Sequence, residues 1–209
     1  ALLDQGGVDL SQCVRLPGES TGTALIAVSA AGENQIVVAP GANRSLAPDS
    51  LRMPETDAII CQLEVPVDTV AAVARAYRGF FCVNLAPATH VDVSILQRAD
   101  LVVVNETESE WYGGSLTACS GLVATTRGSG VATLSRDGAT VAEARPPAVN
   151  AVDTTGAGDT FTAALTVALV EGRAPEAALK FACKAAAEAT TRMGAQPGLP
   201  YREDIDDVE

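Results

Sequence analysis

The feature that most constrains the fold is an alternation of short apolar strands with helical patterns in the middle of the chain. Residues 57–64 (DAIICQLE), 80–87 (FFCVNLAP) and 101–108 (LVVVNETE) are apolar runs that end in polar residues, and helical patterns at 67–77 and 93–99 separate them. Strands that are apolar on both faces and alternate with helices are typical of a parallel sheet enclosed by helices. We therefore predict an α/β fold, a three-layer α/β/α sandwich with a mostly parallel sheet.

The flanking segments follow other patterns. Further strands are predicted at 121–126, 131–135 and 140–146, and the last third of the chain reads as helices at 159–171 and 176–193. Near the N-terminus, two β-runs within residues 21–40 are joined by a turn at 31–34, which indicates a hairpin. We interpret the acidic tail, residues 201–209, as a solvated end.

Composition excludes several classes of partner. The chain has 209 residues, enough to bury a sizeable core, and its net charge of −12 argues against nucleic acid or an anionic membrane surface, since both require a basic face. It contains no apolar run approaching the roughly 18 residues of a membrane span and no secretory signal at its start. Its five cysteines include no C-x-x-C pair, which favours free thiols and a cytoplasmic location.

Polar residues at the strand ends are the first candidates for a functional site, because ligands of open α/β sheets bind at the carboxyl ends of the strands. These residues are Glu64, Asn84, Asn105, Glu108 and Thr126. The acidic run around Glu108 has a second interpretation as a solvated helix start that complements the helix dipole. We favour a functional role for Glu108 because Asn105 stands three residues before it at a strand end.

The stretch AVDTTGAGDTFTAAL, residues 151–165, joins a polar loop to a long helical pattern. Gly156 and Gly158 permit close approach to the backbone, and the first N–H groups of a helix form a site for a phosphate. Asp159 lies among these donors and can take a proton from a hydroxyl during phosphoryl transfer. An ordinary acidic helix start with packed glycines explains the spacing equally well. The chain has no GxxxxGK[ST] and no GxGxxG motif, so a P-loop or a dinucleotide fingerprint is excluded.

The segment VDTTGAGDTF (152–161) resembles the C-terminal signature of the ribokinase (PfkB-type) family of sugar and nucleoside kinases. Further segments are similar, in the same order, to bacterial members: PGESTGTALIAVSAAGENQIVVAPGAN (17–43), CQLEVP (61–66), NLAPA (84–88), NETE (105–108) and RMGAQPGLPYREDID (192–206). The resemblance implies an α/β sandwich with a small β-lid that transfers the γ-phosphoryl group of ATP to the 5-hydroxyl of ribose. Another sugar or nucleoside acceptor, or a truncated copy that binds nucleotide without turnover, are the alternatives.

The same resemblance implies a role for individual residues. It implies Asp159 as the catalytic base, Gly156, Ala157 and Gly158 as the anion hole, and Glu64 and Asn43 as sugar contacts. It implies ATP contacts at Asn105, Thr126, Gly128, Gly158 and Cys183, and an indirect role for Glu108 in holding Mg²⁺. It implies a K⁺ site formed by Asp153 and by Thr155, Ala189, Arg192, Gly194 and Gly198. Asn43 and Asp153 also have simpler interpretations, as a helix cap and a turn former, and Gly198 stands where many relatives have serine.

The chain also departs from the family pattern. It begins without the first sheet strand, part of the lid and the glycine-rich loop that grips the sugar, so we expect residues 1–209 to be one N-terminally incomplete kinase domain with a lid hairpin at about 21–39. The connection from 111 to 123 is too short for the helix usual there. An unpaired lid edge invites pairing, so we expect a homodimer through the lid.

Overall fold

The main body of the protein is a six-stranded sheet. The computed structural model describes residues 2–28 and 34–206. The strand order is β3-β4-β5-β6-β7-β8. The four strands β3 (Ala58–Cys61), β4 (Phe80–Asn84), β5 (Leu101–Asn105) and β6 (Leu122–Thr126) are parallel, and β7 (Ala132–Arg136) and β8 (Ala139–Ala144) are antiparallel. The predicted mostly parallel sheet is confirmed.

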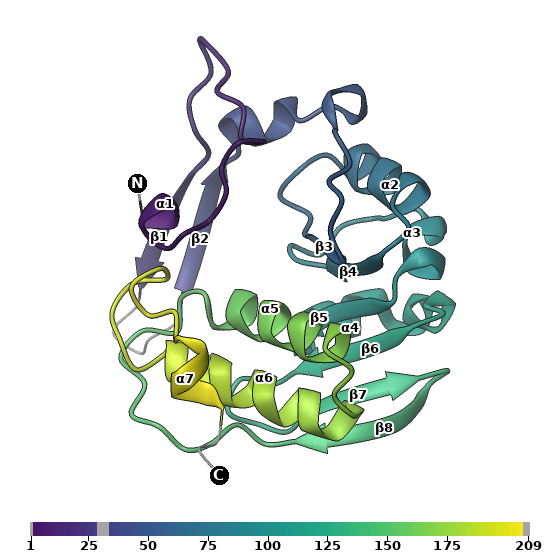
Figure 1. The fold of residues 1–209 in the computed structure, drawn as a ribbon, viewed down its shortest axis with the longest axis vertical. Helices are drawn as coiled ribbons and strands as arrows, with labels where there is room; N and C mark the ends of the chain where they lie inside the picture. The colour runs from purple at the N-terminus through teal and green to yellow at the C-terminus, as the bar shows by residue number, and fades with distance from the viewer. Residues whose placement is uncertain (1, 29–33, 207–209) are drawn as a thin grey trace.

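Helices cover both faces of this sheet (Figure 1). The helices α2 (Val67–Ala76) and α3 (Val93–Arg98) pack on one face, and α5 (Ala157–Val170) and α6 (Pro175–Ala189) pack on the other. Successive residues of a strand point to opposite faces, so Val102 belongs to the core beneath α2 and α3, whereas Val103 belongs to the core beneath α5 and α6. Both are buried, which explains why the strands are apolar throughout and confirms the three-layer architecture.

A separate two-stranded antiparallel sheet stands to one side of the main body (Figure 1). It consists of β1 (Thr23–Val28) and β2 (Asn34–Ala39), with Leu25 opposite Val37. Residues 31–33 of the predicted hairpin turn lie outside the described residues. Short elements flank this sheet: α1 (Leu2–Gln5), η1 (Gly41–Ser45) and η2 (Pro48–Ser50). The side chains of Leu25 and Val37 are 69% and 68% exposed, so this small sheet presents apolar groups to solvent.

The connection after β5 is short, as the sequence indicated. It consists of α4 (Glu106–Tyr112) and a 3₁₀ helix, η3 (Gly113–Ala118), before β6 begins. None of the helices in the described ranges combines the length and the apolar character needed to cross a membrane.

The C-terminal helix ends earlier than predicted. The pattern at 176–193 suggested a helix to Met193, but α6 ends at Ala189. The hydroxyls of Thr190 and Thr191 each donate at 2.7 Å to the carbonyls of Ala187 and Glu188, three residues before them. Threonine hydroxyls satisfy the terminal carbonyls in this way and so favour a helix end. The residues after Ala189 form a loop that contacts the segment before α5, through Gly194 and Ala195.

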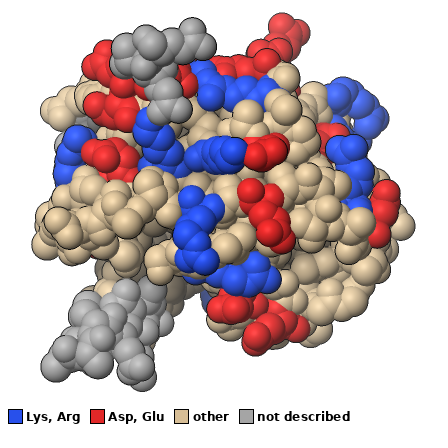
Figure 2. All heavy atoms as spheres, turned by 90° about the horizontal axis from the view of Figure 1, so that it is seen from below, with Lys and Arg blue, Asp and Glu red and all other residues tan. Residues whose placement is uncertain are grey.

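The interpretation of the tail as a solvated end holds for residues 201–204, which are exposed, but is wrong for Ile205, which is buried, and for Asp206, which is half-buried. Residues 202–206 comprise α7 (Arg202–Ile205) and the residue after it. The Arg202 guanidinium donates to both carboxylate oxygens of Glu171 at 2.8 Å, and Asp206 accepts from Arg202 at 2.6 Å and from Arg173 at 2.9 Å. Figure 2 shows basic and acidic side chains lying next to one another over the face seen from below, rather than one continuous basic area.

Candidate active site

The loop before α5 has a glycine where the backbone demands one. Gly156 is the N-cap of α5 with φ of 80°, in the left-handed region that favours glycine. A Cβ placed on it would lie 3.2 Å from the Cβ of Ala195. Both the backbone angle and the close approach of the loop after α6 therefore require glycine here. Sequence analysis missed Ala195, because its role depends on two loops that are distant in the chain and meet only in the fold.

The first turn of α5 leaves backbone donors without partners. The Ala157 N–H donates to the Thr154 carbonyl at 3.2 Å, so this predicted member of the anion hole is engaged within the loop. The N–H groups of Gly156, Gly158 and Asp159 have no acceptor among the described residues. Unpaired amides at the positive end of a helix dipole attract an anion. The structure thus supplies donors at Gly156 and Gly158, and adds the Asp159 amide to them.

The Cβ side of Gly158 faces open space. Gly158 has no left-handed φ, and a Cβ placed on it would meet nothing within 4 Å. Neither the backbone conformation nor packing within the described chain therefore requires a glycine at this position. The Asp159 side chain is exposed beside it and accepts no hydrogen bond from the described residues. This geometry can hold an anion next to a carboxylate that is free to accept a proton.

Asp153 ties the loop before α5 to the loop after α6. One of its carboxylate oxygens accepts the Thr155 N–H at 2.9 Å, and the other accepts the Gly194 N–H at 2.8 Å. Hydrogen bonds lower the pKa of Asp153. The largest contribution comes from the Thr155 side chain, followed by the backbone of Thr155 and the backbone of Gly194. The bond to Thr155 is the turn-forming arrangement expected of an aspartate. The bond to Gly194 is a long-range contact that turn chemistry does not explain.

Three main-chain oxygens converge on Gly198, which is buried. A Cβ on this residue would lie 2.6 Å from the Ala189 oxygen, 2.9 Å from the Gly194 oxygen and 3.6 Å from the Arg192 oxygen. These are three of the carbonyls that the sequence resemblance assigned to a K⁺ site. Carbonyl and carboxylate oxygens are the ligands that hard cations prefer, so the residues present fit a monovalent cation near this point.

We expect Gly198→Ala to destabilise the protein by about 1–3 kcal/mol, because the new methyl group overpacks a site closed by backbone oxygens. Chemical denaturation measures the change. Gly114→Ala is the matched control: Gly114 is exposed in η3, and its Cβ would meet nothing within 4 Å. Equal midpoints for the two variants would contradict the crowding at Gly198.

The carboxyl ends of β5 and β6 bring two predicted nucleotide contacts together. Asn105 pairs with Thr126 in the register of the two strands. The Asn105 side-chain oxygen accepts the Glu108 N–H at 2.8 Å, and the Glu108 carboxylate accepts the Asn105 N–H at 2.7 Å, which together form a capping box at the start of α4. Glu108 is only 8% exposed, so its interpretation as part of a solvated helix start is wrong. Burial raises the pKa of Glu108, and the bond from Asn105 acts in the opposite direction.

Glu108→Gln separates the charge of this residue from its capping bond, since a glutamine oxygen still accepts the Asn105 N–H. The raised pKa of Glu108 means that the folded state disfavours the charged carboxylate. The free energy of unfolding therefore falls as pH rises from the ordinary pKa of a glutamate to the raised pKa of Glu108. We therefore expect the variant to melt at the same or a higher temperature than the parent at pH 7, with the difference shrinking in acid. Glu110→Gln, on the exposed side of the same helix, is the control for loss of a surface charge and should melt close to the parent at pH 7. A large loss of stability at pH 7 would contradict this expectation.

The other predicted residues are placed as follows. Glu64 is exposed just after β3, and its N–H donates to the Gln62 side chain. Gly128 has φ of 53° in the turn after β6. Asn43 is half-buried in η1, whose N-cap is Pro40, and its side chain makes no capping bond there. Cys183 lies in the core between α6 and β8 with 1% exposure, so it offers almost no surface to a ligand.

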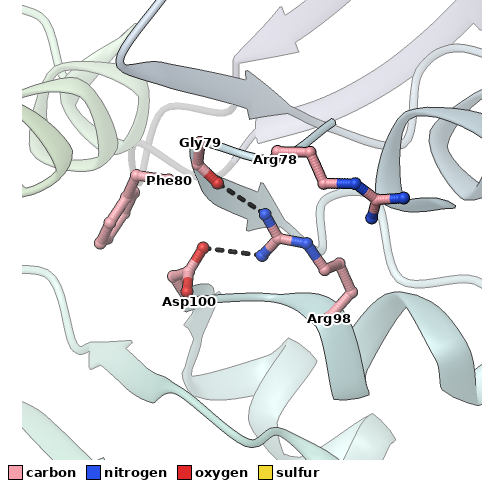
Figure 3. A pocket seen from close by; sticks show the side chains of 5 residues that line it. All are labelled: Arg78, Gly79, Phe80, Arg98 and Asp100. Carbon is pink, nitrogen blue, oxygen red and sulfur yellow. Dashed lines mark hydrogen bonds and ion pairs between the residues drawn. The ribbon is translucent and has the colours of Figure 1, made fainter. Parts of the chain in front are cut away.

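An open hollow of about 520 Å³ lies at the amino ends of the strands, opposite the carboxyl ends that carry the candidate site (Figure 3). It is lined at the amino ends of β4 and β5 by Arg78, Gly79, Phe80, Arg98 and Asp100. The Arg98 guanidinium points to the Gly79 carbonyl at 2.6 Å and to the Asp100 carboxylate at 2.8 Å, and Asp100 also accepts the Phe81 N–H. The hydrogen bonds of Arg98 and Asp100 thus connect the start of β4 to the start of β5. The hollow is therefore a structural junction, far from the strand ends that carry the candidate site.

The fold and this site define a class of protein. The family model for pfkB family carbohydrate kinases matches residues 1–202, and the chain belongs to that family. It is a phosphotransferase of the carbohydrate kinase type.

Individual relatives agree with this assignment. The chain is 33% identical to a ribokinase of Haemophilus influenzae, over 96% of this chain and 72% of the relative, and 31% identical to a deoxyribokinase of Salmonella typhi, over 98% and 74%. Among solved structures, it is similar to an Arabidopsis thaliana ribokinase complexed with ribose and ATP, with a TM-score of 0.73 at 28% identity over 90% of this chain and 69% of that one.

Proposed function

We propose that this protein transfers the γ-phosphoryl group of ATP to the 5-hydroxyl of D-ribose. The observation that carries the proposal is the set of amides at Gly156, Gly158 and Asp159, which have no acceptor among the described residues, beside an exposed carboxylate in a chain of this kinase family. The similarity to ribokinases, one of them solved with ribose and ATP, supports the choice of both substrates.

In this mechanism the Asp159 carboxylate accepts the proton of the attacking hydroxyl. The sugar oxygen then bonds to the γ-phosphorus, the bond between that phosphorus and the β–γ bridging oxygen breaks, and ADP leaves with the electron pair. The amides of Gly156, Gly158 and Asp159 donate to the oxygens of the transferred group, where negative charge is greatest. Glu64 and Asn43 hold the sugar in this proposal, and Asn105, Thr126 and Gly128 contact the nucleotide.

Two cations accompany the substrates in the proposal. Mg²⁺ neutralises the phosphate oxygens of the nucleotide when it is bound. In this proposal Glu108 would act on Mg²⁺ indirectly, as the family resemblance implies. K⁺ would be held by the Asp153 carboxylate and by main-chain oxygens of Thr155, Ala189, Arg192, Gly194 and Gly198. A cation there would stabilise the contact between the Gly156 and Gly194 loops.

A panel of acceptors in an ADP-release assay tests the proposal. We expect ribose to give the highest kcat/KM when it is compared with 2-deoxyribose, fructose phosphate and a nucleoside at fixed K⁺. Similarity to a deoxyribokinase makes 2-deoxyribose the second candidate. Turnover of another acceptor without turnover of ribose would contradict the choice of substrate. Nucleotide binding without turnover of any acceptor would instead favour the non-catalytic copy.

We also propose a homodimer through β1 and β2, in the cytoplasm, where the free cysteines would stay reduced. The small sheet exposes Leu25, Ile26, Val37 and Val38, and such an apolar surface favours association. We expect Leu25→Glu to convert the dimer to a monomer in sedimentation experiments, while Val167→Glu, at an exposed apolar position of α5, leaves the mass unchanged. A monomeric parent protein would contradict the proposal.

A further inference from the structure

Three buried threonines of α5 donate their hydroxyls to carbonyls one helical turn earlier. Thr160 donates to the Gly156 oxygen at 2.9 Å, Thr162 to the Gly158 oxygen at 2.8 Å, and Thr166 to the Thr162 oxygen at 2.8 Å. Thr162 and Thr166 are 2% and 1% exposed. Bonds of this kind tend to bend a helix slightly rather than to stabilise it. Two of them, Thr160 and Thr162, bond to carbonyls at the start of α5, where a role other than helix stability can be sought.

The bond from Thr162 acts on a peptide group that carries a free donor. The Gly158 carbonyl and the Asp159 N–H belong to one planar peptide group, so a bond that fixes the oxygen also fixes the direction of the N–H. A hydrogen bond accepted at the carbonyl also polarises the N–H and strengthens it as a donor. The Asp159 N–H has no acceptor among the described residues, and the Cβ side of Gly158 is open.

The other two threonines act on peptide groups whose donors are already used. The Gly156 carbonyl shares its peptide group with the Ala157 N–H, which donates to Thr154. The carbonyl of Thr162, which accepts from Thr166, shares its peptide group with an N–H in the interior of α5. Interior helix amides donate to the carbonyl four residues earlier. Of the three hydroxyls, that of Thr162 alone reaches a peptide whose N–H is available to a ligand.

We propose that Thr162 is a positioning residue for phosphoryl transfer. Its buried hydroxyl orients and polarises the peptide between Gly158 and Asp159, so that the Asp159 N–H donates to the phosphoryl group as it is transferred. The backbone ladder of α5 already directs the Thr162 N–H to this carbonyl, and the hydroxyl adds a second bond to it from the buried side. The inference rests on the proposed function of the site, which it extends to a residue beneath the anion hole.

The test compares Thr162→Val, Thr162→Ser and Thr166→Val in steady-state kinetics with ATP and the best acceptor. Valine keeps the size and branching of threonine and removes the hydroxyl, and serine keeps the hydroxyl. Loss of a whole oxyanion donor costs about 10²–10³ in kcat, so a misdirected donor in Thr162→Val is expected to lower kcat by about 10-fold. The KM for the sugar should stay within about twofold, since the threonine touches no sugar. Thr162→Ser should recover most of the loss.

Thr166→Val is the matched control, because it removes the same kind of buried hydroxyl bond from the same helix, one turn away from the site. It should keep kcat within about twofold of the parent, while its melting temperature should change about as much as that of Thr162→Val. Equal kcat for the two valine variants, or no recovery in Thr162→Ser, would overturn the proposal.

Failure of the proposed function gives a different result, because the parent protein itself would then phosphorylate no acceptor. The three variants would in that case be compared in calorimetric binding of a non-hydrolysable ATP analogue. Weaker binding by Thr162→Val than by Thr166→Val would support the positioning role, and equal binding would overturn it.

Discussion

Asp159→Asn is expected to lower kcat by about 10²- to 10⁴-fold, the range that removal of a general base covers. Asparagine keeps the size of the side chain and can still face a hydroxyl, but it cannot take the proton from it. The Asp159 carboxylate is exposed in the first turn of α5 and accepts no hydrogen bond from the described residues. No contact within those residues therefore requires its charge for folding. Loss of an acid from the first turn of a helix should cost only about 0.3–1 kcal/mol of stability. Steady-state assays and thermal melts measure the two effects.

Glu176→Gln provides the control for the helix dipole. Glu176 is the acid in the first turn of α6, and its exposed ion pair with Lys180 is of the kind that contributes little. The variant should therefore lose a similar small amount of stability and keep its activity. If Asp159→Asn phosphorylated sugar as fast as the parent protein, Asp159 would not be the base.

Gly158→Ala is expected to change stability and activity in opposite directions. Alanine is the better helix former, and the position has neither a left-handed φ nor a neighbour within 4 Å of the new Cβ, so the unliganded protein should gain about 0.5 kcal/mol. We expect the same methyl group to crowd a phosphoryl group that approaches the neighbouring amides. We expect kcat/KM to fall by about 10²-fold, the scale of a lost oxyanion donor.

Gly114→Ala separates these two effects. Gly114 also has open space around its Cβ position, but it lies in η3, outside the candidate site. This variant should keep full activity. A gain in stability at Gly158 without a loss of activity would show that the open space there is not used by a ligand.

The sequence by itself determined the architecture. Apolar runs such as that of β5 can be buried on both faces only if helices cover both sides of the sheet, so alternation of strand and helix is enough to predict three layers. The turn at Gly156 was predictable because glycine favours the positive φ that this residue adopts, whereas neither φ nor packing within the described residues requires the glycine at 158. The end of α6 was missed because the hydroxyls of Thr190 and Thr191 turn back onto the helix, and helical periodicity does not report such bonds.

Only the tertiary structure decided how the loops combine. The bond from Asp153 to Gly194, the contact of Gly156 with Ala195 and the three carbonyls around Gly198 join segments that are distant in the chain. Burial likewise decided the character of Glu108, which is a buried half of a capping box, and of Cys183, which lies in the core. Local residue patterns specify backbone conformation and the face that is buried. The direction of a single amide or carbonyl depends instead on which distant segment packs against it, and that is settled only when the chain folds.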